Sequence, residues 1–436
     1  MSTYNLISFF GYFILIGIAW LFSSNRKIVN LRVIVWGTVL QFIFAFMVFV
    51  FPPGVSFFLI LNDLVVKVMG SATAGAQFVF GKLALPPGAV GASGEESMGF
   101  FFAFQGLPTI IFFSALISIL YHYGIMQRLI RAFAYVFARL MRISGAESLC
   151  AASSIFVGVE STLTIRPHLR AMTRSELTTV LTAGMATVAS NVLAVYVFSL
   201  RSVFPTIAGH LISASFLSAP AAIIMSKIIV PETEAPETLG KHIQPADSRD
   251  PNLFEAIIVG ANAGVKLIVG IVALLIAVLG LAALADLFLT GAGGRINSLF
   301  GLGIDWSLKG LMGYVFYPLT LIIGVPLSDA GVISRIIGER AIITELAAYQ
   351  DLAAVMKNGL LSDPRSAVIC AYALCGFAHV ASLAIFIGGV SAIAPTTTGT
   401  LSRVGLRALF AATMACLMTA CLAGTFFTKG SIIFGG

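Results

Sequence analysis

The hydrophobic pattern of the chain is a series of long apolar runs separated by short polar segments. A helix needs about 20 apolar residues to cross a bilayer, and eight runs in this sequence approach or exceed that length. The predicted spans are residues 5–22, 33–51, 99–121, 176–200, 204–229, 267–289, 367–393 and 405–427. The pattern therefore predicts an all-α polytopic membrane protein with eight transmembrane helices.

Three further apolar segments do not fit simple spans. Residues 146–165 are interrupted by Ser, Gly and Glu160, and residues 328–350 carry five charged side chains. Residues 311–326 are too short to cross, and we expect an external interfacial helix there. Residues 127–143 space their arginines by 3, 8 and 3 positions with aromatic residues between them, which is typical of an amphipathic helix in the membrane interface.

The scarcity of charge agrees with a membrane protein. Only 10% of the residues are charged, whereas soluble domains have about 25%, so a soluble enzyme or a nucleic-acid-binding protein is excluded. Ten basic residues among the first 174 fall on one predicted side, and only Lys67 and Lys82 fall on the other. The positive-inside rule then places the N-terminus outside and the polar linker 231–252 in the cytoplasm. We expect an integral protein of a bacterial inner membrane.

Arginines flank residues 146–165 on both sides, so both ends of this segment are predicted to be cytoplasmic. A segment with both ends on one side cannot cross, and it must enter the membrane and return. Irregular backbone at membrane depth is tolerated only inside protein or beside a watery cavity. The segment is therefore predicted to be a re-entrant hairpin that lines a site.

An internal repeat supports a second hairpin. The heptad 184–190 (GMATVAS) matches the heptad 376–382 (GFAHVAS) at five of seven positions. Each heptad lies in a predicted span that follows a broken segment with one acid that we expect to be buried, Glu160 or Glu345. The charge pattern gives the two copies opposite orientations, and inverted repeats with broken helices are typical of secondary transporters.

The polar residues inside these segments are the candidate functional groups. Glu160 and Glu345 are predicted to contact substrate or carry a proton, or else to pair with a nearby arginine. His379 is either functional or a hydrogen-bonded packing residue. Hydroxyl groups in the same elements suit a sodium ion, although such groups often bond back to their own helix. Lys266 and Asp286 are predicted to reach the interface from the ends of their span.

No motif favours an enzyme. The five cysteines have neither zinc-like spacing nor a disulfide pattern, and the sequence lacks HExxH, GxSxG and GxxxxGK[ST]. We therefore expect no catalytic activity and no organic cofactor.

Several motifs resemble the concentrative nucleoside transporter family. They are Gly158-Val159-Glu160, Ile165-Arg166-Pro167, Arg174-Ser175-Glu176-Leu177, residues 344–349 (TELAAY) and residues 372–378 (YALCGFA). The resemblance covers residues 98–425. It implies a homotrimer whose protomers each have eight spans, two opposed re-entrant hairpins and an ion-coupled nucleoside site.

The resemblance also implies roles for individual residues. Glu160 resembles the first-hairpin acid near the nucleoside, and Glu345 resembles the second-hairpin acid that accepts hydrogen bonds from ribose hydroxyls. Phe377 and Ser382 match contacts from the seventh span, and Val192 matches an apolar contact to the base.

The chain also departs from the family pattern. Gly158 and Val159 replace a Gln and a Thr that read the base, and His379 replaces an Asn that contacts ribose. In the ion site, Ser153 replaces an Asn and Thr187 replaces a Ser, with the carbonyl groups of Phe156 and Val188 as further ligands. The coupling ion can be sodium or a proton.

The sequence thus predicts four regions: a three-span scaffold (1–126), an interfacial helix with the first repeat (127–230), a loop with a central span (231–310), and the second repeat (311–436). The leading hypothesis is cation-coupled uptake of nucleosides by alternating access. One alternative is the same mechanism for modified nucleosides, nucleoside antibiotics or another polyol-like solute. An alternative of another class is a channel.

Overall fold

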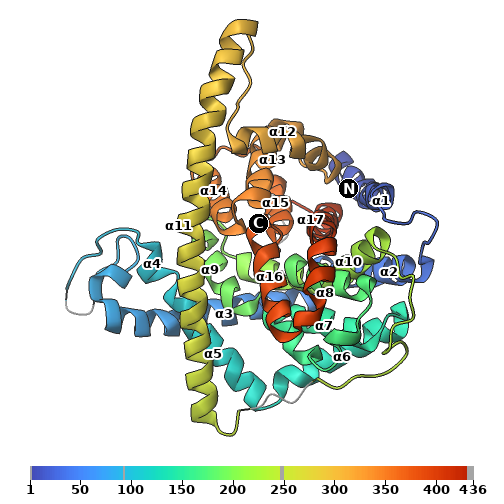
Figure 1. The fold of residues 1–436 in the computed structure, drawn as a ribbon. Helices are drawn as coiled ribbons and strands as arrows, with labels where there is room; N and C mark the ends of the chain where they lie inside the picture. Colours follow the sequence, from blue (N-terminus) through green and yellow to red (C-terminus); the bar gives the residue numbers. More distant parts are fainter. Residues whose placement is uncertain (1, 92–93, 246–249, 430–436) are drawn as a thin grey trace.

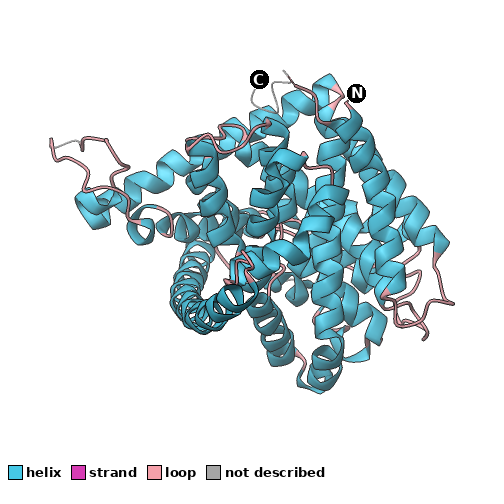
Figure 2. Ribbon diagram, turned by 90° about the horizontal axis from the view of Figure 1, so that it is seen from above, coloured by secondary structure: helices cyan, strands magenta, loops and turns pink. Residues whose placement is uncertain are grey.

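The computed structural model describes residues 2–91, 94–245 and 250–429, which form helices and loops without a β-strand (Figures 1 and 2). Eight helical segments in these ranges are long and apolar enough to cross a membrane. They are residues 3–21, 31–49, 52–84, 102–122, 174–200, 207–229, 253–300 and 395–426. The prediction of an all-α polytopic membrane protein is confirmed.

The eight observed helical segments differ from the eight predicted spans in two places. Helix α3 (Pro52–Phe80) was not predicted, because Asp63 and Lys67 interrupt its apolar run. The predicted continuous span 367–393 is wrong, since it consists of α15 (Pro364–Leu374) and α16 (Val380–Ile393). The number eight was therefore right for a partly different set of helices.

The repeated heptads are the points at which two helices break. The first break separates α8 (Arg174–Ala186) from α9 (Ser190–Leu200), and Thr187 there has extended backbone angles. The second break separates α15 from α16 at Gly376, whose φ of 139° lies in the region that favours glycine. The sequence similarity located a structural repeat, but its residues interrupt helices instead of continuing them.

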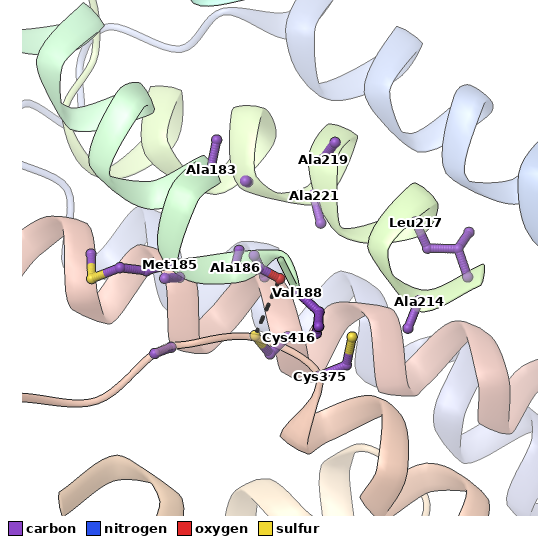
Figure 3. Packing of buried hydrophobic residues seen from close by; sticks show 14 of the residues in the cluster. Ala183, Met185, Ala186, Val188, Ala214, Leu217, Ala219, Ala221, Cys375 and Cys416 are labelled. Carbon is purple, nitrogen blue, oxygen red and sulfur yellow. Dashed lines mark hydrogen bonds between the residues drawn. The ribbon is translucent and has the colours of Figure 1, made fainter. Parts of the chain in front are cut away.

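The two breaks lie against each other in the centre of the protein (Figure 3). A Cβ atom on Gly376 would lie 2.9 Å from the carbonyl oxygen of Ala186, and the Cys416 thiol contacts that same oxygen at 3.8 Å. Gly184 has the ring of Phe386, from α16, against its Cα. A side chain would therefore clash at both positions, with the Ala186 backbone at Gly376 and with the Phe386 ring at Gly184, which explains the glycine at the start of each heptad.

A hairpin precedes each broken helix. The first hairpin consists of α7 (Gly145–Ser154) and the 3-10 helix η2 (Val159–Ile165), which pack on each other. The second consists of α13 (Leu327–Ile342) and α14 (Glu345–Lys357). The acid predicted for each hairpin therefore lies at the beginning of its second arm.

Two more helices frame these repeats. The predicted amphipathic helix is α6 (Ile125–Met141). Helix α11 (Leu253–Phe300) has 48 residues, more than predicted, and is roughly 72 Å long at 1.5 Å per residue. It packs along α5 (Pro108–His122), where a Cβ on Gly264 would lie 2.6 Å from the Cα of Ile111. This long helix follows one side of the protein (Figure 1).

The remaining helices complete the body of the protein. Helix α17 packs against α1, α8, α10 and α15, and α12 packs along α13. Their bounds are α1 (Thr3–Leu21), α2 (Leu31–Phe49), α4 (Phe102–Gln105), α10 (Ile207–Ile229), α12 (Leu308–Ile322) and α17 (Thr398–Phe426).

Candidate functional site

Glu345 is the centre of a buried polar cluster between the two repeats. Thr344 accepts a hydrogen bond from the backbone N–H of Ala347 and caps α14, so Glu345 occupies the first position of that helix. The Tyr196 hydroxyl, from α9, donates to one carboxylate oxygen at 2.5 Å. The other carboxylate oxygen lies 3.0 Å from Nε2 of His379. A negative charge at the start of a helix with two donors beside it is electrostatically favourable.

The orientation of His379 follows from its position at the start of α16. Its Nδ1 accepts a hydrogen bond from the backbone N–H of Ser382 at 3.2 Å. A neutral imidazole that accepts at Nδ1 has its proton on Nε2, and Nε2 faces Glu345. The Ser382 hydroxyl donates to the carbonyl oxygens of His379, at 2.7 Å, and Phe377. The break in the helix thus fixes one donor toward the carboxylate.

The contact between His379 and Glu345 is short but poorly aligned. Nε2 of His379 and the facing Glu345 oxygen have no hydrogen-bond partner in the described part of the chain, although both side chains are buried, at 0% and 3% exposed. Buried polar atoms are normally hydrogen-bonded, and unpaired ones need an explanation such as a bound molecule. His379 thus offers a hydrogen-bond donor and Glu345 an acceptor, and both are available to a ligand.

Two neighbouring cavities adjoin this cluster. The larger one, of ≈520 Å³, has Gly158 and Glu160 in its wall. The smaller one, of ≈30 Å³, has Thr344 and Glu345 in its wall. The residues common to both walls are Val192, Tyr196, Ile271, Leu274 and Phe377. The two acids therefore face adjoining compartments, and the larger lies within the usual size range of ligand pockets, roughly 300–1,000 Å³.

Neither acid pairs with an arginine among the described residues, in contrast to the alternative considered from the sequence. A Cβ on Gly158 would lie 3.2 Å from the Cβ of Ala189 and 3.6 Å from a Glu160 carboxylate oxygen. The first hairpin therefore packs closely on the α8–α9 break. The side chain of Val159 lies outside the described part of the structure.

The four predicted ion ligands lie around the same break. The Thr187 hydroxyl donates to the carbonyl oxygen of Ala183 at 2.9 Å, and Phe156 accepts a hydrogen bond from the backbone N–H of Ser190 at 3.1 Å. The Val188 carbonyl accepts from Ser215. Carbonyl and hydroxyl oxygens each have a further lone pair for a cation.

Ser153 differs from the other three predicted ion ligands. Its hydroxyl oxygen is fully buried and lies near the Tyr121 hydroxyl, but no hydrogen bond of regular geometry is found for it in residues 2–91, 94–245 and 250–429. An unpaired buried oxygen at the predicted position fits a hard cation such as sodium.

Sequence reasoning missed two residues at the site. Tyr196 follows Val192 by four residues on α9, a spacing that places both side chains on one helix face. This spacing was the feature of the sequence that could have identified Tyr196 as a site residue. Lys266 was predicted to reach the membrane interface, whereas it lies in the wall of the larger cavity together with Glu160. Its position depends on the packing of α11 along α5, which in turn contacts α9 of the first repeat, and hydropathy does not reveal these contacts.

Comparisons with known proteins agree with this arrangement. Residues 210–424 and 10–83 match the models for the C-terminus and N-terminus of Na+ dependent nucleoside transporters. Residues 103–203 match a gate model described as nucleoside recognition.

Among curated relatives, an uncharacterized transporter of Haemophilus influenzae is 37% identical over 98% of this chain and 99% of its own length. The nucleoside permease NupC of Helicobacter pylori is 36% identical over 97% of this chain and 98% of its own length. Human solute carrier family 28 member 3 is 35% identical, and the match covers 96% of this chain but 60% of that protein.

Solved structures of CNTnw are similar over nearly the whole chain. Its inward-facing, substrate-bound state has a TM-score of 0.85 and 34% identity, and the match covers 97% of this chain and 98% of CNTnw. A variant of CNTnw in an outward-facing state has the same TM-score and covers 98% of each chain.

Proposed function

The chain belongs to the Na+-dependent, or concentrative, nucleoside transporter family, and we propose that it takes up nucleosides by cation-coupled alternating access. It is a transporter and not an enzyme. The observation that carries the proposal is the buried Glu345 carboxylate, held by Tyr196 and facing an unpaired donor on His379.

The Glu345–His379 pair is suited to a ribose ring. Adjacent ribose hydroxyls each offer one donor and two acceptor lone pairs. The free carboxylate oxygen accepts from one hydroxyl while Nε2 of His379 donates to its neighbour. Tyr196 occupies the other carboxylate oxygen and so holds the carboxylate in one orientation. A site with buried polar groups of this kind rejects analogues without the hydroxyls.

The larger cavity is the proposed place of the base. Val192 and Phe377 supply apolar surface next to Glu345, and Gly158 and Glu160 lie on the hairpin side. Gly158 has no side chain to read a base edge. We therefore expect weak discrimination among bases, and modified nucleosides remain the alternative cargo.

For the coupling ion, the family description and the unpaired Ser153 hydroxyl favour sodium. The ligands would be Ser153, Thr187 and the carbonyl groups of Phe156 and Val188. A proton is the alternative, because Glu160 and Glu345 can each bind one. The site lies on the broken helices and hairpins, which would move together relative to α5 and α11.

The same proposal includes a homotrimer in a bacterial inner membrane with its N-terminus outside. The four regions 1–126, 127–230, 231–310 and 311–436 remain the proposed division of the chain. The outward-facing and inward-facing states of CNTnw support alternating access as the mechanism.

The test is uptake of radiolabelled uridine and adenosine into proteoliposomes. A sodium gradient, a proton gradient and no gradient are imposed in parallel. Accumulation above the external concentration with the sodium gradient alone supports sodium coupling, and accumulation with the proton gradient alone supports proton coupling. Equilibration without accumulation under every gradient contradicts the proposal and favours a channel.

A further inference from the structure

A second pocket, separate from the hairpin acids, is lined mainly by basic side chains. It encloses ≈410 Å³ and is formed by the start of α2, the end of α6 and the linker between α10 and α11. We call it the basic pocket. Its wall residues are Arg32, Arg139, Arg142, Lys241, His242, Ala138, Leu140 and Gly240.

The α2 and α6 parts of the basic pocket are held by defined contacts. Nε of Arg32 donates to the carbonyl oxygen of Leu140 at 3.0 Å, and Nη2 donates to that of Arg139 at 3.4 Å. Arg142 ends α6 in the left-handed conformation, with φ of 50°, the one positive φ at a described non-glycine residue. Arg32 therefore ties α2 to the last turn of α6.

The linker part of the basic pocket is also held in place. Gly145 and Lys241 both donate a backbone N–H to the carbonyl oxygen of Thr238, at 3.0 and 3.1 Å. The ring of His242 stacks on Tyr135 of α6, with centroids 5.2 Å apart. The linker thus folds over α6 and brings Lys241 to the arginines from a distant part of the sequence.

Within the described part of the chain, the positive charge of the basic pocket has no acidic partner. Arg139, Arg142 and Lys241 form no ion pair with a carboxylate in the described ranges. Lys227, which precedes the same linker, pairs instead with Glu147 and Glu232. The positive-inside rule explains basic residues on one side of the membrane, but it does not require them to converge on one hollow from three elements.

The surface of α6 places the basic pocket at a lipid boundary. Arg128, Arg131, Tyr135 and Arg139 follow one another at spacings of 3, 4 and 4 residues and so share one face of α6, and Arg142 directly follows the last residue of that helix. Beside this face lies an apolar edge of Ile125 and Leu129, which are each 42% exposed, whereas Phe133, Val136 and Leu140 pack against the protein core. A charged face next to an apolar edge is typical of a helix in the membrane interface.

We propose that the basic pocket binds a phosphate group, supplied by the headgroup of an anionic phospholipid. Guanidinium groups bind phosphate oxygens in a bidentate manner, and basic pockets on the cytoplasmic side of membrane proteins bind phospholipid headgroups. A free phosphate offers the same chemistry without the acyl chains, and the apolar edge of α6 favours the lipid.

The test compares three proteins purified without lipid. The pocket variant is Arg139→Gln with Arg142→Gln and Lys241→Gln, which leaves the anchoring Arg32 intact. The control variant is Lys27→Gln with Arg170→Gln and Arg174→Gln, which removes the same number of charges from exposed residues outside α6 and outside the pocket wall. Thermal stability is measured during titration with phosphatidylglycerol, with phosphatidylcholine and, in a separate arm, with inorganic phosphate.

Phosphatidylglycerol is expected to raise the melting temperature of the wild type and the control variant more than phosphatidylcholine does. The pocket variant is expected to bind phosphatidylglycerol at least ~10-fold more weakly, since each basic residue contributes about 1 kcal/mol near an anionic surface and tenfold corresponds to about 1.4 kcal/mol. Arg142→Gln alone, as a milder change, should give an intermediate loss.

Three outcomes would contradict the inference. Stabilisation by inorganic phosphate but not by phosphatidylglycerol would support the phosphate site and overturn its lipid source. An equal loss in the pocket and control variants would mean that only general surface charge matters. No response of the wild type to either compound would overturn the site altogether.

Discussion

The hydroxyl of Tyr196 is predicted to hold Glu345 in its binding orientation. Tyr196→Phe removes one oxygen atom and the 2.5 Å hydrogen bond to the carboxylate. The ring remains against Tyr349, whose centroid is 4.9 Å away, so packing is preserved. One oxygen of a buried carboxylate then has no donor, and the carboxylate is free to reorient.

The expected size of this effect follows from the type of bond. A hydrogen bond to a charged group contributes about 1.5–3 kcal/mol, and each ~1.4 kcal/mol is a factor of ten in affinity. We therefore expect Tyr196→Phe to weaken nucleoside binding by roughly 10- to 150-fold. Calorimetric titration of the detergent-purified protein with uridine or adenosine measures this change directly.

Tyr349→Phe is the matched control. Its hydroxyl donates to the backbone carbonyl of Ala371 at 3.0 Å and not to Glu345. Removal of this neutral bond should lower thermal stability slightly while nucleoside affinity stays within a factor of about three. Wild-type affinity in Tyr196→Phe, or equal losses in both variants, would refute the role assigned to the Tyr196 hydroxyl.

Three further predictions concern neighbouring residues. Ser153→Ala should raise the sodium concentration that gives half-maximal uptake by about 5- to 30-fold, because the loss of a polar contact costs about 1–2 kcal/mol. Ser154→Ala should leave this concentration unchanged, because the Ser154 hydroxyl bonds to Cys150 and Ser161. Gly376→Ala should lower the melting temperature by several degrees, since backbone strain costs roughly 1–3 kcal/mol and the added Cβ meets the backbone of Ala186. Gly280→Ala, where an added Cβ lies in open space, should leave the melting temperature unchanged. Equal melting temperatures of the two variants would contradict the close contact between the two helix breaks. His379→Asn should bind nucleoside with an affinity within several-fold of the wild type, because the amide still donates a hydrogen bond. His379→Phe should lower the affinity at least ~10-fold. Equal affinities of the two variants would exclude the role of His379 as a donor.

The heptad repeat illustrates what the sequence could predict. Five shared residues located the two segments that cross at Gly376 and Ala186. Their unwinding was not predicted, because both heptads lie within long, mainly apolar runs and hydropathy cannot distinguish a continuous helix from a broken one. The break depends on distant partners, such as Ser215, which accepts a hydrogen bond from the backbone N–H of Val188 at 3.2 Å.

The candidate site could be predicted only in part, because it too depends on contacts between distant segments. Contacts around the second break bring Glu345, Phe377, His379 and Ser382 together, and the motif resemblance had assigned these four residues to one site. Tyr196 comes from the other repeat, and its approach to Glu345 depends on how α9 packs against α14. Pairing between repeats is a tertiary property, which neither periodicity nor charge placement specifies.

The central claim is that Glu345 recognises the ribose hydroxyls. The most direct test measures the affinities of uridine and 2′,3′-dideoxyuridine for the wild type and for Glu345→Gln. The control is Glu255→Gln, at an exposed position in α11. The wild type and the control should prefer uridine by at least ~100-fold, because an unpaired buried carboxylate rejects the dideoxy compound, and Glu345→Gln should lose most of this preference. An unchanged preference in Glu345→Gln would contradict the assignment.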